Sequence, residues 1–146
     1  MNTKIDLVPG RVMQGYQNYH SLYKAKSDTW TQTNISEHIK IVKQSCRIDE
    51  IIALKIWRML NGLSFPSIYL ELTVIEALKY QRTNQLSNNI WKVLQYLSSD
   101  FITARIIDPS NTNNIISEDL SRIEKETIRS ASSVALKQSN WKNILW

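Results

Sequence analysis

The chain has 146 residues, of which 42% are hydrophobic, and this is enough for one domain with its own core. The formal net charge of +5 suits either an anionic partner (a nucleotide, a nucleic acid or an acidic lipid surface) or a solvated basic surface. A single cysteine, Cys46, excludes an internal disulfide and a cysteine zinc site. No apolar run approaches the ~20 residues of a membrane span, so we expect a cytoplasmic protein with no membrane partner.

The N-terminal part of the chain predicts short strands. Residues 3–8 (TKIDLV) have the alternation of a strand, and Pro9–Gly10 are expected to end it. Residues 19–24 and 29–33 flank a turn signal and predict a hairpin. The strand at 3–8 has no evident partner in the sequence, although a lone strand leaves its backbone groups unpaired.

The next segment predicts a helix over about 35–46. Asn34, with Glu37 three residues later, has the pattern of a capping box. His38 falls on the apolar face, where a histidine is more often a satisfied core residue than a ligand. The residues that we expect on this inner face are Ile35, His38, Ile39, Val42 and Cys46.

The central stretch 51–80 predicts two helices joined by a tight turn. Gly62 is expected to end the first helix, Ser64 to cap the second, and Pro66 to occupy the first turn of the second. The second helix is apolar on most faces, which is typical of a buried central helix.

Four polar residues stand out in this stretch. Lys55 and Arg58 lie three apart and share a face of the first helix. Ser67 and Glu71 lie four apart on the apolar second helix, where buried polar groups must be satisfied. We interpret Glu71 as a brace for the structure rather than an acid–base group.

The remainder of the chain predicts helices separated by a long loop. Residues 86–100 carry an amphipathic stripe (Ile90, Val93, Leu94, Leu97 and Phe101), and 101–107 read as extended. The loop 108–121 is rich in side chains that can bond its own backbone. A further helix over 118–139 is expected to bury Leu120, Ile123, Ile128, Ala131, Val134 and Ala135. The tryptophans Trp57, Trp91 and Trp141 are interpreted as packing residues, and the apolar tail from Trp141 is expected to dock on the body.

Together these elements predict a mainly α fold. We expect a short N-terminal strand or hairpin region in residues 1–33, followed by a bundle of about five helices in residues 34–146. The second region reads as a helical domain.

Three motifs, in order along the chain, resemble one protein family. They are KIDLVPGR at 4–11, then LKIW at 54–57 with PSIYLEL at 66–72, and finally IIDPSNTNNI at 106–115. The chain is similar to the C-terminal half of polymerase-β-type nucleotidyltransferases related to oligoadenylate synthetase and cyclic GMP-AMP synthase. The resemblance implies that residues 1–33 are the remnant of the catalytic-domain sheet and that residues 34–146 are the C-terminal helical domain.

The resemblance implies roles for particular residues. Asp6 matches the family's third metal-binding carboxylate, and Lys55 and Ser67 match residues that contact the triphosphate of a nucleotide. Ile68 stands where several relatives have a base-stacking tyrosine. The resemblance implies structural roles, without catalysis, for the loop residues Asp108, Asn111 and Asn114.

The chain departs from the family by lacking its first half. It contains no Gly-Ser dipeptide for the triphosphate and no Asp-x-Asp pair for two Mg²⁺ ions. Two-metal nucleotidyl transfer needs carboxylates that hold both ions, and Asp6 alone cannot do this. We therefore expect Mg²⁺ only in an intact enzyme whose catalytic half comes from the same or another chain, and no activity or cofactor for this chain alone.

Two other functions stay open from the sequence. The chain can act as a free-standing module that binds nucleotide or nucleic acid through its basic residues, with a steep salt dependence. It can also act as an interaction protein whose N-terminal strand completes a partner's sheet.

Overall fold

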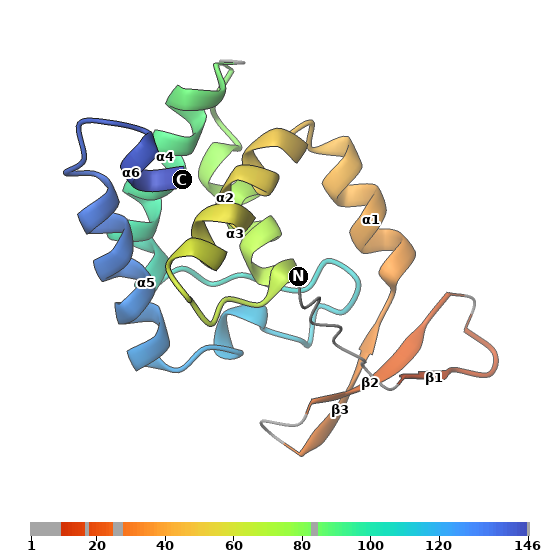
Figure 1. The fold of residues 1–146 in the computed structure, drawn as a ribbon. Helices are drawn as coiled ribbons and strands as arrows, with labels where there is room; N and C mark the ends of the chain where they lie inside the picture. Colours follow the sequence, from red (N-terminus) through yellow and green to blue (C-terminus); the bar gives the residue numbers. More distant parts are fainter. Residues whose placement is uncertain (1–9, 17, 25–27, 83–84, 146) are drawn as a thin grey trace, which may run out of the picture.

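The computed structural model describes residues 10–16, 18–24, 28–82 and 85–145 (Figure 1). The helices gather into one body, and a small antiparallel sheet projects from it beside helix α1 (Figure 1). This arrangement confirms the predicted mainly α fold with a short N-terminal strand region.

The sheet consists of β1 (Gly10–Val12), β2 (His20–Lys24) and β3 (Thr29–Thr33), in the order β1-β2-β3. His20 pairs with Thr33 and Lys24 with Thr29, so the predicted hairpin is confirmed. The strand expected at 3–8 lies outside the described residues. Gly10, which we expected to end a strand, lies in β1 and is the first residue that the structure describes.

Helix α1 (Ile35–Gln44) begins as predicted, because Asn34 Oδ1 accepts the backbone N–H of Glu37 at 3.1 Å. The prediction of its inner face was right only in part: Val42 packs against the core and His38 is half-buried, but the other three positions are exposed. Ile35 and Ile39 are 47% and 50% exposed, and Cys46 lies exposed beyond the end of the helix. The reason is position: α1 lies at the rim of the body, and none of its residues is fully buried (Figure 1).

Helices α2 (Ile48–Leu60) and α3 (Ser67–Leu78) are joined by a turn in which Gly62 has φ +60°, as its predicted helix-ending role requires. The predicted cap by Ser64 was wrong. Pro66 is itself the N-cap residue of α3, and its side chain makes no capping hydrogen bond. Ser64 lies too far before the helix and donates to Glu124 Oε1 at 3.3 Å instead.

The core forms around α3, as expected for a helix that is apolar on most faces. Tyr69 is fully buried, in edge and tilted ring contacts with Phe65 and Phe101. Helix α4 (Leu86–Ser98) packs its predicted stripe into the same core. The buried residues of this stripe are Ile90, Val93, Leu94, Leu97 and Phe101.

The segment after α4 is less extended than predicted. Asp100–Ile102 form the short 3₁₀ helix η1, and a second one, η2 (Ile116–Glu118), lies within the predicted loop. Helix α5 (Arg122–Ala135) starts later than expected because Ser121 and Glu124 form a capping box there.

Two apolar positions of α5 were assigned to the wrong face. Ile128 and Ala135 are buried as predicted, but Ile123 and Val134 are 80% and 58% exposed. The chain then ends in α6 (Lys142–Leu145), where Ile144 is buried.

The C-terminal segment docks on the body, which confirms that prediction. The rings of Trp141 and Trp91 meet edge to face with their centroids 6.2 Å apart, and Trp57 is almost fully buried. Within the part of the chain that the structure describes, we find no helix with the length and apolar character needed to cross a bilayer.

Candidate functional site

A cavity with a volume of about 1200 Å³ lies between the hairpin and the helical body. Lys24 and Thr29 of the hairpin line one side of it. The end of α2, the α2–α3 turn and the segment from Asn113 to Glu124 line the rest. Small-molecule sites usually occupy a few hundred to about 1,000 Å³, so this cavity has room for a nucleotide.

The start of α3 forms the basic part of the cavity wall. Arg58 of α2 donates from Nη1 to the carbonyl oxygen of Phe65 at 2.6 Å and to Ser67 Oγ at 3.1 Å. Ser67 is exposed at the first position of α3. Among the described residues, no side chain caps the start of α3, and a helix N-terminus favours anions.

Lys55 does not line this cavity. Its Nζ donates to Glu71 Oε1 at 2.5 Å, with the Lys55 side chain 35% exposed and that of Glu71 16% exposed. Lys55 and Arg58 therefore share a face of α2, as their spacing predicts, but they reach different residues of α3. The ion pair agrees with the interpretation of Glu71 as a brace.

The opposite wall is mostly acidic and carboxamide-rich. Lys24 Nζ donates to Asn114 Oδ1 and to Asp119 Oδ1, each at 2.8 Å, and so ties the hairpin to the late loop. Glu118 and Glu124 also line this wall. The cavity thus carries a cationic side at α3 and a hydrogen-bonding side at the loop.

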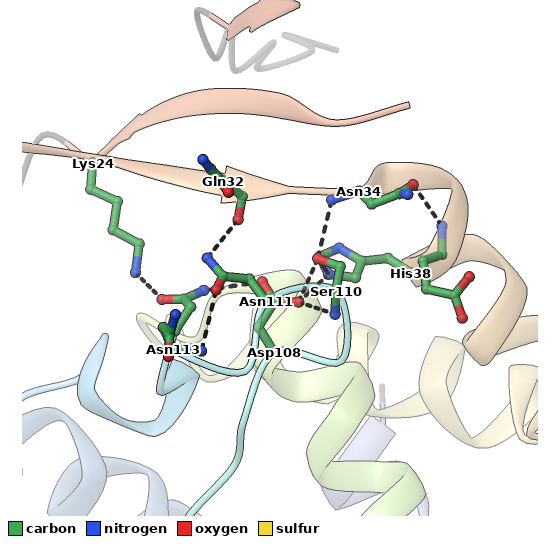
Figure 2. Close-up of polar contacts among 10 residues, drawn as sticks. Lys24, Gln32, Asn34, His38, Asp108, Ser110, Asn111 and Asn113 are labelled. Carbon is green, nitrogen blue, oxygen red and sulfur yellow. Dashed lines mark hydrogen bonds and ion pairs between the residues drawn. The ribbon is translucent and has the colours of Figure 1, made fainter. Parts of the chain in front are cut away.

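A polar cluster around Asp108 holds this loop against the hairpin and α1 (Figure 2). Asp108 is 2% exposed, and its Oδ1 lies 2.7 Å from both His38 Nε2 and Ser110 Oγ. Asn114 Nδ2 donates to Asp108 Oδ2 at 3.0 Å. His38 is thereby satisfied within the structure, as we expected for a histidine on this face.

Two more contacts join the loop to the segment before α1. Asn111 Nδ2 donates to the carbonyl oxygen of Gln32 at 3.2 Å (Figure 2). The backbone N–H of Asn34 donates to Ser110 Oγ at 3.1 Å (Figure 2). Through these contacts the loop fixes the position of the hairpin, and hence one wall of the cavity.

The hydrogen bonds of this cluster determine the ionisation of Asp108. Burial by itself raises the pKa of its carboxyl group, but the hydrogen bonds from His38, Ser110 and Asn114 outweigh burial. The pKa falls from its ordinary value of 3.8 to about 2. The carboxylate is therefore charged at neutral pH and acts as the acceptor at the centre of the cluster.

The predicted site residues do not all meet. Ser67 and Asn114 line the same cavity, Lys55 lies outside its lining, and Asp6 falls outside the described residues. No group of three or more His, Cys, Asp or Glu side chains within the described ranges is arranged to hold a metal ion. The donors that the structure describes therefore do not fit a two-metal centre.

Sequence reasoning missed a second buried polar network. Glu50, which is 6% exposed, accepts from Arg47 Nη1 at 3.2 Å and from Asn89 Nδ2 at 2.6 Å. Arg47 Nη2 also donates to the carbonyl oxygen of Gln81 at 2.5 Å. The spacing of Arg47 and Glu50, three apart, was the only local signal, and it pointed equally to a surface pair.

Two solved structures share this fold. The chain matches CdnC of E. coli MS115-1, solved with ATP, with a TM-score of 0.74 and 17% identity over 94% of this chain and 58% of CdnC. It matches CdnC in a complex with HORMA-deltaN with a TM-score of 0.72 and 16% identity, over 91% of this chain and 56% of that one. No protein-family model and no curated protein matches the sequence. The chain therefore has the fold of somewhat more than half of CdnC.

Proposed function

We propose that this chain is the helical, nucleotide-facing half of a nucleotidyltransferase related to oligoadenylate synthetase and cyclic GMP-AMP synthase. The observation that carries the proposal is the fold likeness to CdnC, a protein solved with ATP, over 94% of this chain. The three motifs that resemble the family support it independently. The division into a sheet remnant over 1–33 and a helical domain over 34–146 belongs to the same proposal.

The cavity is the proposed site for the triphosphate of the donor nucleotide. Arg58, Ser67 and the uncapped N-terminus of α3 together offer a guanidinium, a hydroxyl and backbone N–H groups at one place. This combination suits phosphate, since arginine forms bidentate contacts with its oxygens and helix N-termini attract anions. Arg58 thereby joins Ser67 as a binding residue, although the sequence motifs did not assign it.

Lys55 is proposed as a second phosphate contact that becomes available when Glu71 releases it. In the structure its ammonium group is neutralised by Glu71. A triphosphate carries more negative charge than one carboxylate, so it can compete for this flexible point charge.

Asp108, Asn111 and Asn114 are proposed to hold the loop rather than to react. Their hydrogen bonds all run to the loop itself, to the hairpin or to α1. They therefore shape the wall opposite Ser67.

Nucleotidyl transfer requires catalytic elements that are not found in this sequence. We propose that this half, in the same or another polypeptide, supplies the Gly-Ser and Asp-x-Asp elements and the Mg²⁺ ions, with Asp6 as an added ligand. Because the described donors do not fit a metal centre, we assign no metal-dependent step to them. The chain alone is then an inactive binding half, and its single cysteine suits a cytoplasmic setting.

The test is calorimetric titration of ATP into the chain and its variants. Losing a charge-assisted hydrogen bond costs about 1.5–3 kcal/mol, so Arg58→Ala should weaken ATP binding by roughly tenfold or more. Ser67→Ala should weaken it by less, because it removes a neutral donor. Lys92→Ala is the control, since Lys92 is an exposed residue of α4 outside the cavity lining. Equal affinities for all four proteins would overturn the proposed site.

A further inference from the structure

Another cavity, of about 440 Å³, lies where the C-terminal segment packs on α4. Trp91 of α4 lines it together with Trp141 and Ile144 of the C-terminal segment. The other lining residues all carry an amide or a hydroxyl group: Ser87, Asn88, Gln138, Ser139 and Asn140. We call this space the tryptophan cavity. It shares no lining residue with the cavity at α3, and α6 lies on the side of the body away from the hairpin (Figure 1).

The two indole rings provide a fixed surface on which a flat ring can stack. Trp91 and Trp141 are partly buried and pack against the core, so the body holds them in place. Their ring planes meet at 79° with the centroids 6.2 Å apart. In such an edge-to-face pair, the ring that presents its edge keeps both of its faces clear of the other ring. Indole faces of this kind favour planar ligands, and nucleobases above all.

The amide groups of the cavity supply both an acceptor and a donor. Asn88 Nδ2 donates to Gln85 Oε1 at 2.5 Å, and Asn140 Oδ1 accepts the backbone N–H of Lys142 at 2.9 Å. Among the described residues, Asn88 Oδ1 and Asn140 Nδ2 are left without a partner. An amide oxygen and an amide N–H together match an edge of adenine, which offers an amino donor beside a ring-nitrogen acceptor.

The C-terminal wall of the cavity carries positive charge and no carboxylate. Residues 137–145 include Lys137 and Lys142 but no Asp or Glu, and residues 85–91 of the facing wall carry no charge. The two lysines are exposed, and neither forms an ion pair with a described residue. They lie on either side of the lining segment 138–141. Phosphates on both sides of a base in the cavity therefore meet a lysine.

We propose that the tryptophan cavity binds one unpaired adenine base of a single-stranded nucleic acid, with Lys137 and Lys142 at the flanking phosphates. A duplex keeps its bases paired and stacked, so it must first unpair one to fill the cavity. A free nucleotide carries phosphate on one side of its base only and engages fewer of the lysines. The proposal goes beyond the half-enzyme function and uses none of the residues that line the cavity at α3.

The experiment measures the fluorescence anisotropy of a fluorescein-labelled oligo(dA) strand titrated with the full chain. The strand should bind roughly tenfold more tightly than the same strand within a duplex. AMP should displace it only at much higher concentrations than unlabelled oligo(dA) does. Binding should weaken steeply with salt, and Lys142→Ala should lower the slope of log K against log salt by about 0.7–1. Lys43→Ala, at an exposed position of α1, should leave this slope unchanged.

Substitutions within the cavity test the contact with the base. Trp141→Ala should weaken binding roughly tenfold or more, because it removes a stacking surface. Since Trp141 also packs against the core, circular dichroism verifies the fold of this variant. The double variant Asn88→Ala/Asn140→Ala changes two exposed positions and should weaken binding roughly fivefold or more. Gln95→Ala is its control, since it removes an exposed amide of α4 outside the cavity lining and should not change the affinity.

The outcomes separate this inference from the proposed function. Absence of binding, equal affinity for strand and duplex, or equal displacement by AMP and oligo(dA) overturns the single-strand site. Binding that the double variant does not weaken overturns the assignment of the tryptophan cavity. If ATP binding still depends on Arg58 in these cases, the proposed function survives. If the strand binds as expected while ATP does not bind, the tryptophan cavity stands and the site at α3 fails.

Discussion

His38 Nε2 lies 2.7 Å from Asp108 Oδ1, although the two residues are 70 positions apart in the sequence. The contact joins the first helix to a loop in the last third of the chain. Because Asp108 also accepts from Ser110 and Asn114, one carboxylate organises both the loop and its attachment. The site wall therefore depends on a residue that does not line the cavity.

Replacing this carboxylate should destabilise the protein. Asp108→Asn keeps the shape of the side chain but replaces one carboxylate oxygen with an NH₂ group. When this group faces the NH₂ group of Asn114, two donors oppose each other, so we expect a loss of about 2–3 kcal/mol in the free energy of unfolding. Urea unfolding followed by circular dichroism measures it. Asp100→Asn, at an exposed position, should change stability by less than about 0.5 kcal/mol. Equal stabilities of the two variants would contradict the role of Asp108.

The lowered pKa of Asp108 predicts a specific acid dependence. A carboxyl group whose pKa is about 2 in the folded state and 3.8 when unfolded stabilises the fold at pH values above 3.8. This contribution, roughly 2 kcal/mol, is lost as the pH falls from about 4 to 2. Unfolding measured across that range should show a smaller decline in Asp108→Asn than in the native chain. Parallel curves for the two proteins would show that Asp108 is not the group responsible.

Lys55 and Glu71 allow a test in which one substitution tightens binding. If Glu71 competes with phosphate for Lys55, Glu71→Gln should raise the affinity for ATP severalfold, because it frees the ammonium group. Lys55→Ala should weaken binding, above all in an enzyme completed by its other half. Calorimetry on both variants checks the pair, and an affinity that neither change alters would remove Lys55 from the site.

The network of Arg47, Glu50 and Asn89 should be strongly coupled. Glu50→Ala removes the shared acceptor of a buried donor, Asn89, and a half-buried one, Arg47, so we expect a loss of about 3 kcal/mol in unfolding free energy. The double variant Arg47→Met/Glu50→Leu should cost less than the sum of its single changes. A double-mutant cycle by chemical unfolding measures this coupling, and strict additivity would contradict it.

Periodicity predicted the parts of the fold where a helix has one buried face. The apolar stripe that runs from Ile90 in α4 to Phe101 in η1 has helical spacing, and all five of its residues are buried. The same reasoning failed at α1, where Ile35 and Ile39 have a suitable spacing but the helix lies at the rim. Periodicity shows that a helix has an apolar face, but it does not show whether this chain covers that face.

The candidate site was harder to predict from the sequence than the helices were. Ser67 was recognised by its place in a motif, and Gly62 by its position after a helix. Lys24 contacts Asn114 and Asp119, which lie 90 and 95 residues later in the sequence. Contacts over such separations cannot be predicted from local residue spacing. Arg58 was noticed only as a neighbour of Lys55, because its contact with Ser67 depends on how the α2–α3 turn folds back.

The long-range ties of the hairpin have a consequence for synthesis on the ribosome. Lys24, Gln32 and Asn34 find their partners only after residues 110–119 have emerged. At about 5–20 residues per second, the hairpin waits roughly 5–20 s for its attachment to the body. During that interval its exposed Trp30 and Tyr23 are available to chaperones. The cavity is therefore among the last features of this chain to be completed.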